Sequence, residues 1–242
     1  MRKINKTSEL NWLLGIIFVA LGVAICSKAN LGVSMIAAPA FVVQEAIFPL
    51  WNGFSVGMTE YVLQGILLIL LCIIIRKFNW KFLLAFLVAF IYGYVLDFFL
   101  FVLSGVNFST VYLRWIMLLI GDCITAFGVA CFFRTYLSLQ VYELFVSAFS
   151  KTYKKNINAV KWIFDITLLV ISITLALILF RDITYFDFST ITHSSYHSIG
   201  LGTILTTIIN SPIITIMGKF IDKIFNPTPL FPKLQKLLSV QE

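Results

Sequence analysis

Six long apolar runs constrain the fold of this chain more than any other feature of its sequence. They occupy residues 11–26, 56–75, 82–103, 111–133, 160–180 and 198–224. A helix needs about 20 mainly apolar residues to cross a bilayer, and the first run reaches that length if it extends through Ser27 or tilts. Charged residues make up only 12% of the chain, against about a quarter in soluble domains. We therefore predict an all-α polytopic membrane protein with six transmembrane helices.

The distribution of basic residues predicts how these helices are oriented. Lysine and arginine gather at the N-terminus, around Arg76, and within residues 134–161 and 219–236. Few basic residues lie in the connections between these clusters, which are residues 28–55, 104–110 and 181–197. Because basic loops stay in the cytoplasm, both termini are expected there, with the chain in a bacterial cytoplasmic membrane. This pattern also accounts for the net charge of +7 without a nucleic-acid partner.

The first apolar run is expected to be a retained helix rather than a signal peptide. Its flank is basic, as in a signal peptide, but Cys26-Ser27-Lys28 makes a poor small-residue cleavage site. Five further spans follow it. The four cysteines lie in or at the ends of the spans, and their spacing fits neither a zinc site nor a disulfide framework. No metal and no cofactor is expected.

An internal repeat indicates that the chain has two halves. Gly22-Val23-Ala24 matches Gly128-Val129-Ala130 at an offset of 106 residues, and Lys28 matches Arg134 at the same offset. Because each half holds three spans, the second half must enter the membrane from the opposite side, as in the inverted repeats of secondary transporters. The predicted single membrane domain comprises a first repeat (10–105), an inverted second repeat (110–225) and a cytoplasmic tail (226–242). A duplication without a transport role stays an alternative.

Each half also contains an apolar segment that is too short or too interrupted to span a membrane. Residues 29–48 are broken by Gly32 and Pro39, and residues 137–149 contain Glu143. Such segments either re-enter the protein at membrane depth, where protein or a wet cavity satisfies their backbone, or lie as interfacial helices on the surface. Their symmetric placement favours re-entry.

Three short motifs resemble the YczE/YitT-like family of bacterial membrane proteins. They are Gly22-Val23-Ala24 with 28–34, Gly93-Tyr94-Val95-Leu96-Asp97, and Gly200-Leu201-Gly202-Thr203 with Ser211-Pro212. The resemblance covers residues 12–224. Met35, Ala37 and Val141 depart from the residues that the family often has there. The resemblance implies a transporter-like integral membrane protein.

Charged residues within the spans are the candidate substrate- or ion-binding residues, because a charge at membrane depth is costly and marks a functional site by default. Asp122 lies in the middle of the fourth span beside Gly121, and Asp97 lies two-thirds along the third. Both fit an ion-coupling carboxylate or a ligand for a cationic substrate. The alternative for Asp122 is a structural acid bonded to a hydroxyl, to Arg114 or to Arg134.

Six further candidates come from the repeat and the interrupted segments, and one of them is Glu143 in the second interrupted segment. Glu60 and Asp165 are repeat mates, which suits a pair of gates or, equally, acids that complement a helix N-terminus. Lys28 and Arg134 either pair with buried acids or extend to the headgroups. A basic residue beside the candidate Asn30 and the break at Gly32, such as Lys28, suits an anionic group on a substrate. Uncharged polar residues that can add contacts are Asn52, Gln64, Thr125, Gln140 and Asn210. His193 and His197 have metal-like spacing only if their loop is helical, so a solvated loop is expected.

The function that these features favour is a secondary transporter for a small polar or amphipathic molecule. The chain has no phosphate-binding loop and hence no ATPase of its own. It is not expected to be an enzyme, although Asp97 and Asp122 leave a two-aspartate site open. The remaining alternatives are the substrate-binding membrane subunit of an ATP-driven vitamin importer and a membrane scaffold. The expected partners are the bilayer and an unknown small molecule, with a homodimer left open.

Overall fold

The computed structural model describes residues 4–76, 78–181, 198–230 and 232, and these residues form eight helices and two short strands. The elements in chain order are β1 (Ile4–Thr7), α1 (Ser8–Ala29), α2 (Ala38–Ile47), α3 (Val56–Ile75), α4 (Lys81–Val102), α5 (Val111–Phe132), α6 (Val141–Thr152), α7 (Ile157–Phe180), α8 (Leu201–Ile224) and β2 (Phe225–Thr228). Six helices, all except α2 and α6, are long and apolar enough to cross a membrane. The prediction of a polytopic helical membrane protein is therefore confirmed.

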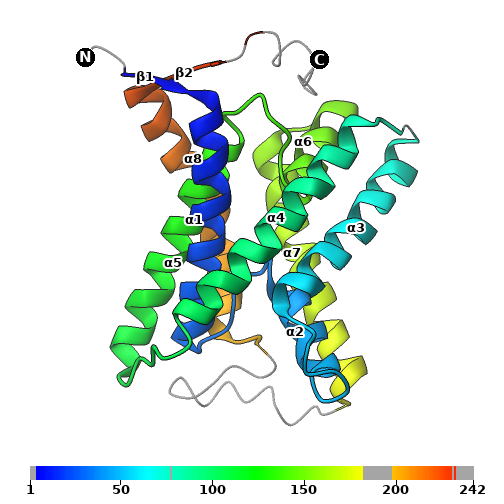
Figure 1. Cartoon of the computed structure of the whole chain (residues 1–242), viewed down its shortest axis with the longest axis vertical. Helices are drawn as coiled ribbons and strands as arrows, with labels where there is room; N and C mark the ends of the chain where they lie inside the picture. Colours follow the sequence, from blue (N-terminus) through cyan, green and yellow to red (C-terminus); the bar gives the residue numbers. More distant parts are fainter. Residues whose placement is uncertain (1–3, 77, 182–197, 231, 233–242) are drawn as a thin grey trace.

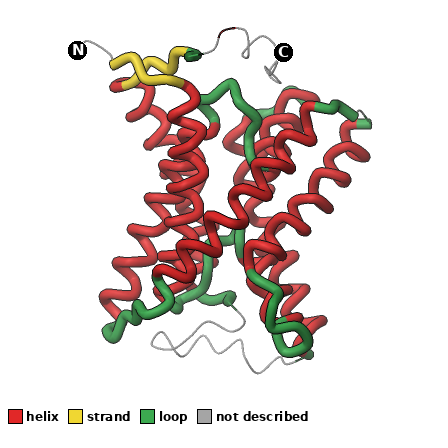
Figure 2. The backbone as a smooth tube through the Cα atoms, in the orientation of Figure 1, coloured by secondary structure: helices red, strands yellow, loops and turns green. Residues whose placement is uncertain are grey.

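The two strands were not predicted from the sequence. β1 and β2 pair in parallel, with Ile4 opposite Phe225 and Thr7 opposite Thr228, and Figure 2 shows them at one end of the bundle. Just beyond β2, the Leu230 amide donates to the Glu9 carboxylate at 3.0 Å. These contacts hold residues 225–230, which include the start of the predicted tail, against the beginning of α1. We call this end of the bundle the strand end.

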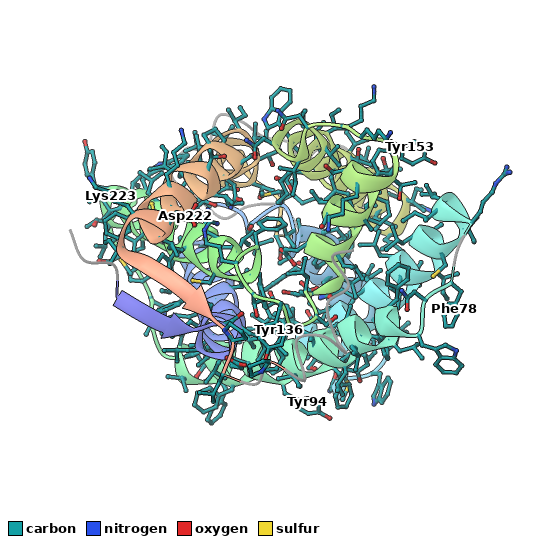
Figure 3. All side chains as sticks on the ribbon, turned by 90° about the horizontal axis from the view of Figure 1, so that it is seen from above. Phe78, Tyr94, Tyr136, Tyr153, Asp222 and Lys223 are labelled. Carbon is teal, nitrogen blue, oxygen red and sulfur yellow. The ribbon has the colours of Figure 1, made fainter. Side chains whose placement is uncertain are left out.

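Most basic residues of the described chain lie at the strand end, as the charge pattern predicts for one face, whereas Lys28, Arg114 and Arg181 lie at the opposite end. α3 and α5 finish there, α6 lies there, and α7 begins there (Figure 1). Arg76, Arg134 and Lys151 therefore share this end with Lys223 of α8. Figure 3 looks down on it and shows Asp222 and Lys223 on the far side of the molecule from Phe78 and Tyr153.

α1 and α5 cross closely, and this crossing fixes the position of α5, which carries Asp122. A Cβ atom built on Gly22 would lie 2.5 Å from the carbonyl oxygen of Gly121, and one on Gly128 would lie 3.0 Å from that of Gly15. Only glycine lets the two backbones approach this closely. Gly121 and Gly128 follow Gly15 and Gly22 by 106 residues, so the two contacts are related by exchange of the repeats.

The other helix contacts show the same exchange. Both halves have the order long, short, long, long helix. α2 packs on α3 and α7, whereas α6 packs on α7 and α3; α4 contacts α1 and α3, whereas α8 contacts α5 and α7. These reciprocal contacts are those expected from a repeat with twofold symmetry. The inverted repeat and its boundaries stay a prediction, which this geometry supports.

Both short helices begin inside the bundle and run outward. Ala38 to Val42 at the start of α2 are buried, whereas Leu50 just beyond its end is 88% exposed. α6 likewise begins with the buried residues Val141 to Leu144 and is followed by the exposed Tyr153. An interfacial helix would expose one face along its whole length. The burial of only one end therefore favours re-entrant segments at both places.

The starts of the two short helices meet in the interior. Met35 and Ile36, just before α2, share an apolar cluster with Tyr142 and Val146 of α6 and Phe164 of α7. Neither start is therefore exposed at a surface. The polar residues beside this cluster form the candidate site.

Candidate functional site

Four carboxylic acids from four helices lie buried at the centre of the fold. Glu60 belongs to α3, Asp122 to α5, Glu143 to α6 and Asp165 to α7, and none is more than 1% exposed. Glu143 is within electrostatic range of both Glu60 and Asp165, and Asp165 is within range of Asp122. We call these four residues the acidic cluster.

Lys161 of α7 is the one basic residue that neighbours the acidic cluster among the described side chains. It is 4% exposed and forms an ion pair with Asp165. The two are four residues apart on one helix, so their side chains lie on the same face. Lys161 also interacts electrostatically with Asp122 and Glu143. One lysine therefore faces three of the four acids.

Glu60 is held by hydrogen bonds from two helices. The Tyr142 hydroxyl at the start of α6 donates to Glu60 Oε2 at 3.0 Å, and the Gln64 side-chain amide one turn along α3 donates to the same oxygen at 3.3 Å. Tyr92 of α4 is fully buried and lies within electrostatic range of Glu60 and Glu143. These contacts connect α3, α4 and α6 at the site.

Asp122 is joined to the last long helix. The Asn210 side-chain amide of α8 donates to Asp122 Oδ1 at 2.8 Å. Towards the start of α8, Thr203, Thr206 and Thr207 are also buried, and their helical spacing places them on the same side as Asn210. A polar stripe on α8 therefore leads from Thr203 to the acidic cluster.

Glu143 lies in the first turn of α6, a helix too short to span the membrane. Its carboxyl lies within electrostatic range of Lys161 and of Asp165. The positive end of the helix dipole also favours a negative group in this first turn. Glu143 therefore places a buried carboxyl at the positive end of a short helix, between a lysine and a second acid.

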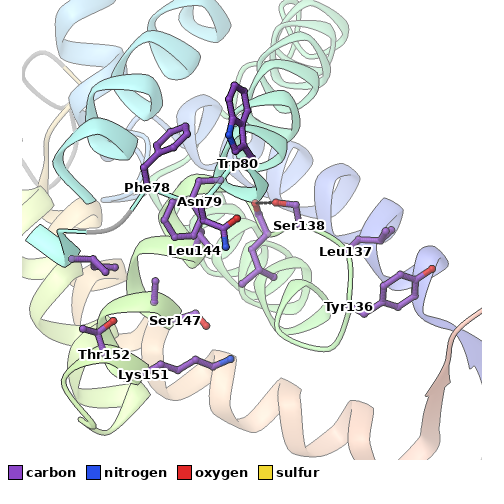
Figure 4. A pocket seen from close by; sticks show the side chains of 14 residues that line it. Phe78, Asn79, Trp80, Tyr136, Leu137, Ser138, Leu144, Ser147, Lys151 and Thr152 are labelled. Atoms are coloured by element: carbon purple, nitrogen blue, oxygen red, sulfur yellow. Dashed lines mark hydrogen bonds between the residues drawn. The ribbon is translucent and has the colours of Figure 1, made fainter. Parts of the chain in front are cut away.

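Two pockets approach the site from the strand end. One, of about 490 Å³, is lined by Phe78, Asn79 and Trp80 and by residues of α6 that include Leu144, the neighbour of Glu143 in the sequence (Figure 4). A second, of about 440 Å³, lies between α5, α7 and α8 and reaches Lys161; its polar lining includes Arg134, Asn158, Ser211, Thr215, Lys219 and Asp222. The second pocket therefore reaches the neighbour of the acidic cluster, Lys161, whereas the first reaches Leu144, which follows Glu143 in the sequence.

The sequence-based candidates divide between the cluster and the ends of the bundle. Glu60, Asp122, Glu143 and Asp165 come together. Arg134 instead forms a bidentate ion pair with Asp222, at 2.6 Å for each contact. Lys28 and Asn30 lie at the other end of the bundle, apart from the cluster. The Lys28 ammonium lies 3.5 Å from the Ser104 carbonyl oxygen. Asn30 is exposed and follows α1 with a positive φ of 54°.

Asp97 serves the start of α3 rather than the cluster. Its Oδ1 accepts from the Gly57 amide at 2.8 Å, and its Oδ2 accepts from the Ser55 hydroxyl at 2.6 Å. The Ser55 hydroxyl oxygen in turn accepts from the Met58 amide, as an N-cap does. Asp122, by contrast, contacts α8. The two aspartates therefore do not form a common site.

Substituting Asp97 by alanine is expected to destabilise the protein without changing ligand binding. The loss of an extended N-cap should lower the free energy of unfolding by about 1–2 kcal/mol. Thermal unfolding in detergent measures the loss, and Asp97→Asn, which keeps an acceptor for Gly57, should lose less. A defect in ligand affinity equal to that of Asp122→Asn would contradict the assignment.

Lys161, Tyr92 and Tyr142 are the site residues that sequence reasoning missed. Lys161 was counted with the basic residues of one face, yet its spacing from Asp165 within an apolar span is the signal of an internal ion pair. Gln64 and Asn210 were noted only as uncharged polar residues. Tyr92 and Tyr142 carry no such signal, because aromatic residues are frequent throughout the spans. His193 and His197 lie outside the described residues.

Two of the three short motifs contact each other. Gly32 has a φ of +111°, and a Cβ there would lie 2.3 Å from the Thr203 hydroxyl. The Gly202 amide donates to the Leu31 carbonyl at 2.8 Å. Residues 28–34 and 200–203 thus form one packed unit at the end opposite the strands, where the polar stripe on α8 begins.

A family profile described as a family of unknown function, DUF6198, matches residues 7–219. The chain belongs to this family. The DUF6198 match contains the whole acidic cluster, Lys161 and Asn210, and it ends before Asp222. No curated protein and no solved structure matches the chain. The function of this DUF6198 protein is therefore inferred from its own geometry.

Proposed function

We propose that this protein is a secondary transporter that moves a small molecule across the bacterial cytoplasmic membrane by alternating access. The observation that carries the proposal is the acidic cluster, because ionisable residues within membrane spans mark substrate or proton pathways. Each acid also has a carboxyl oxygen without a hydrogen-bond partner among the described residues: Glu60 Oε1, Asp122 Oδ2, Glu143 Oε2 and Asp165 Oδ2. Buried polar atoms are rarely left unpaired, so a bound ligand or proton is expected there.

The short helices support the same proposal. Transporters with inverted repeats place their sites where interrupted helices end near the bilayer midplane. Here α2 and α6 both begin beside the cluster, and α6 supplies Glu143 and Tyr142 directly. The resemblance to the YczE/YitT-like family, which implies a transporter-like protein, points the same way.

The polar residues along α8 define a route for the substrate. From the end opposite the strands, buried hydroxyls lead to Asn210 and Asp122. From there Ser211 and Thr215 line the pocket that opens at the strand end. We infer that this route crosses the membrane with the strand end in the cytoplasm, as the basic residues predict.

Substituting Asp122 by asparagine is the test of this proposal. The change keeps the shape and the acceptor for Asn210 but removes the charge. We expect ligand affinity and flux to fall about 10–100-fold, since a hydrogen bond to a charged group contributes about 1.5–3 kcal/mol. A thermal-shift screen against metabolites finds the ligand, and counterflow in proteoliposomes measures its flux.

The control is Asp97→Asn, which changes an aspartate of the same chain outside the cluster and should keep full flux. Transport by the wild-type protein alone would exclude the ATP-driven importer subunit. Absence of flux for every ligand found, together with co-purification of an ATPase, would instead favour that subunit. Hydrolysis of a ligand that depends on Asp122 would contradict a transporter and indicate an enzyme.

A further inference from the structure

The charges at the centre of the fold do not balance. The acidic cluster holds four carboxyls, and Lys161 is the only cation that reaches it among the described residues. Ionised carboxylates are strongly disfavoured in a dry interior unless they are paired. In the absence of a ligand, the remaining carboxyls must therefore take up protons, and a positively charged ligand can replace those protons.

Two neutral polar groups at the site also have unused hydrogen-bonding capacity. The Tyr92 hydroxyl and the Asn210 side-chain oxygen have no hydrogen-bond partner among the described residues, and both side chains are fully buried. Together with the four unpaired carboxyl oxygens, these groups are predominantly acceptors. A ligand that satisfies them must bring several N–H or O–H donors, as an ammonium group does with three.

The arrangement suits an organic cation better than a metal ion. No group of three or more His, Cys, Asp or Glu side chains in the described part of the chain converges closely enough to hold a metal. Aromatic rings stand beside the acids instead, with Tyr142 and Phe164 6.4 Å apart between their centroids. Aromatic faces attract organic cations.

We propose that the site binds a small organic cation with a primary ammonium group, and that Lys161 is a built-in cation which the ligand displaces from Asp165. The displaced lysine side chain can move into a neighbouring pocket, because it already lines the pocket of about 440 Å³ between α5, α7 and α8. Asn158, Ser211 and Thr215 offer polar groups there. This inference rests on the proposed transport function and specifies its substrate class.

Lys161, as a built-in cation, should allow the empty carrier to change conformation. When the site is empty, Lys161 neutralises part of the cluster, so the empty carrier can change conformation without exposing unpaired charges. Without Lys161, only a bound ligand can neutralise this part of the acidic cluster. The Lys161→Met variant should therefore retain exchange of ligand for ligand and lose net flux at least tenfold.

The experiment uses the full-length protein in lipid nanodiscs and proteoliposomes. The probe is 1,4-diaminobutane, with 1,4-butanediol as the neutral isostere and acetate as the anion. We expect the diamine alone to raise the unfolding temperature of the wild-type protein. Lys161→Met should bind the diamine at least tenfold more tightly, because a tethered competitor acts at a high effective concentration. Lys223→Met, which changes an exposed lysine of α8, is the matched control and should not change affinity.

The outcomes separate this inference from the proposed function. If the diol or acetate binds and is transported while the diamine is not, the substrate class is overturned and the transporter remains. If the diamine binds equally well to wild type and Lys161→Met, the role of Lys161 is overturned. If no metabolite binds or moves, the transport function itself fails.

A second variant covers a failure of Lys161→Met to fold. Lys161→Gln removes the competing charge, keeps a side-chain amide that can donate to Asp165, and leaves all four acids in place. It should bind the diamine more tightly than Lys161→Arg, which keeps the competing charge. Equal affinity of these two variants would overturn the inference.

Discussion

Replacing Gly22 by valine should remove most of the folded protein. A Cβ atom at Gly22 would lie 2.2 Å from the Thr125 hydroxyl and 2.5 Å from the Gly121 carbonyl oxygen. Backbone atoms cannot rotate away, so α1 and α5 must separate. We expect a loss of about 3 kcal/mol or more, at the upper end for overpacking, and a corresponding fall in the unfolding temperature measured by intrinsic fluorescence in detergent.

Two further glycines make this prediction specific. Gly121→Val should have an equal effect, because Gly121 faces Gly22 across the same crossing. Gly105 has open space around it, with nothing within 4 Å of a built Cβ, so Gly105→Ala should leave stability unchanged. A Gly22→Val protein with wild-type stability would show that α1 and α5 do not cross as described.

Replacing Lys161 by methionine should lower the free energy of unfolding by a similar amount, for an electrostatic reason. Removing one partner of a buried ion pair typically costs about 3–5 kcal/mol, because the other charge stays buried without compensation. Here the loss leaves Asp165, and with it the whole acidic cluster, without a cation from the protein. Chemical unfolding at pH 8 measures the change in free energy.

Two controls test the electrostatic origin of this loss: a change of pH, and removal of the ion-pair partner Asp165. The loss should shrink at pH 5, because protonated carboxyls no longer need a cation. Lys161→Met combined with Asp165→Asn should recover part of the stability, and the coupling energy from this double-mutant cycle isolates the pair. A loss independent of pH, with no coupling between the two positions, would show that Lys161 contributes only by packing.

The location of the helices was predictable because each span depends on local composition. The expected runs 160–180 and 198–224 correspond to α7 and α8 within three residues at each end. The first run was expected at residues 11–26 and forms a helix over Ser8–Ala29, because Ser27 and Lys28 continue the helical turn at the membrane edge. The strand pairing was missed, since Ile4–Thr7 and Phe225–Thr228 are far apart in sequence and neither is strongly patterned.

The site was predictable only in part. Asp122 and Glu143 were found because a carboxyl in an apolar segment is costly wherever the chain goes. Asp97 satisfies the same criterion, yet it caps α3. Both carboxyls accept hydrogen bonds from another helix, Asp122 from the Asn210 side chain in the interior and Asp97 from Ser55 and Gly57 at the start of α3, and the sequence around each aspartate does not specify its donors.

Hydropathy and charge alone specify six spans and two interrupted segments, because transfer of side chains into lipid depends on each residue and its near neighbours. The Gly15, Gly22, Gly121 and Gly128 pattern also marks the repeat in the sequence. Helix crossing decides the rest. Glu60, Asp122, Glu143 and Asp165 become one site, with Lys161 as its cation, only because α6 packs on α3 and α7 and because α8 packs on α5 and α7. Contacts over such sequence distances depend on how whole helices pack, and no local pattern encodes them.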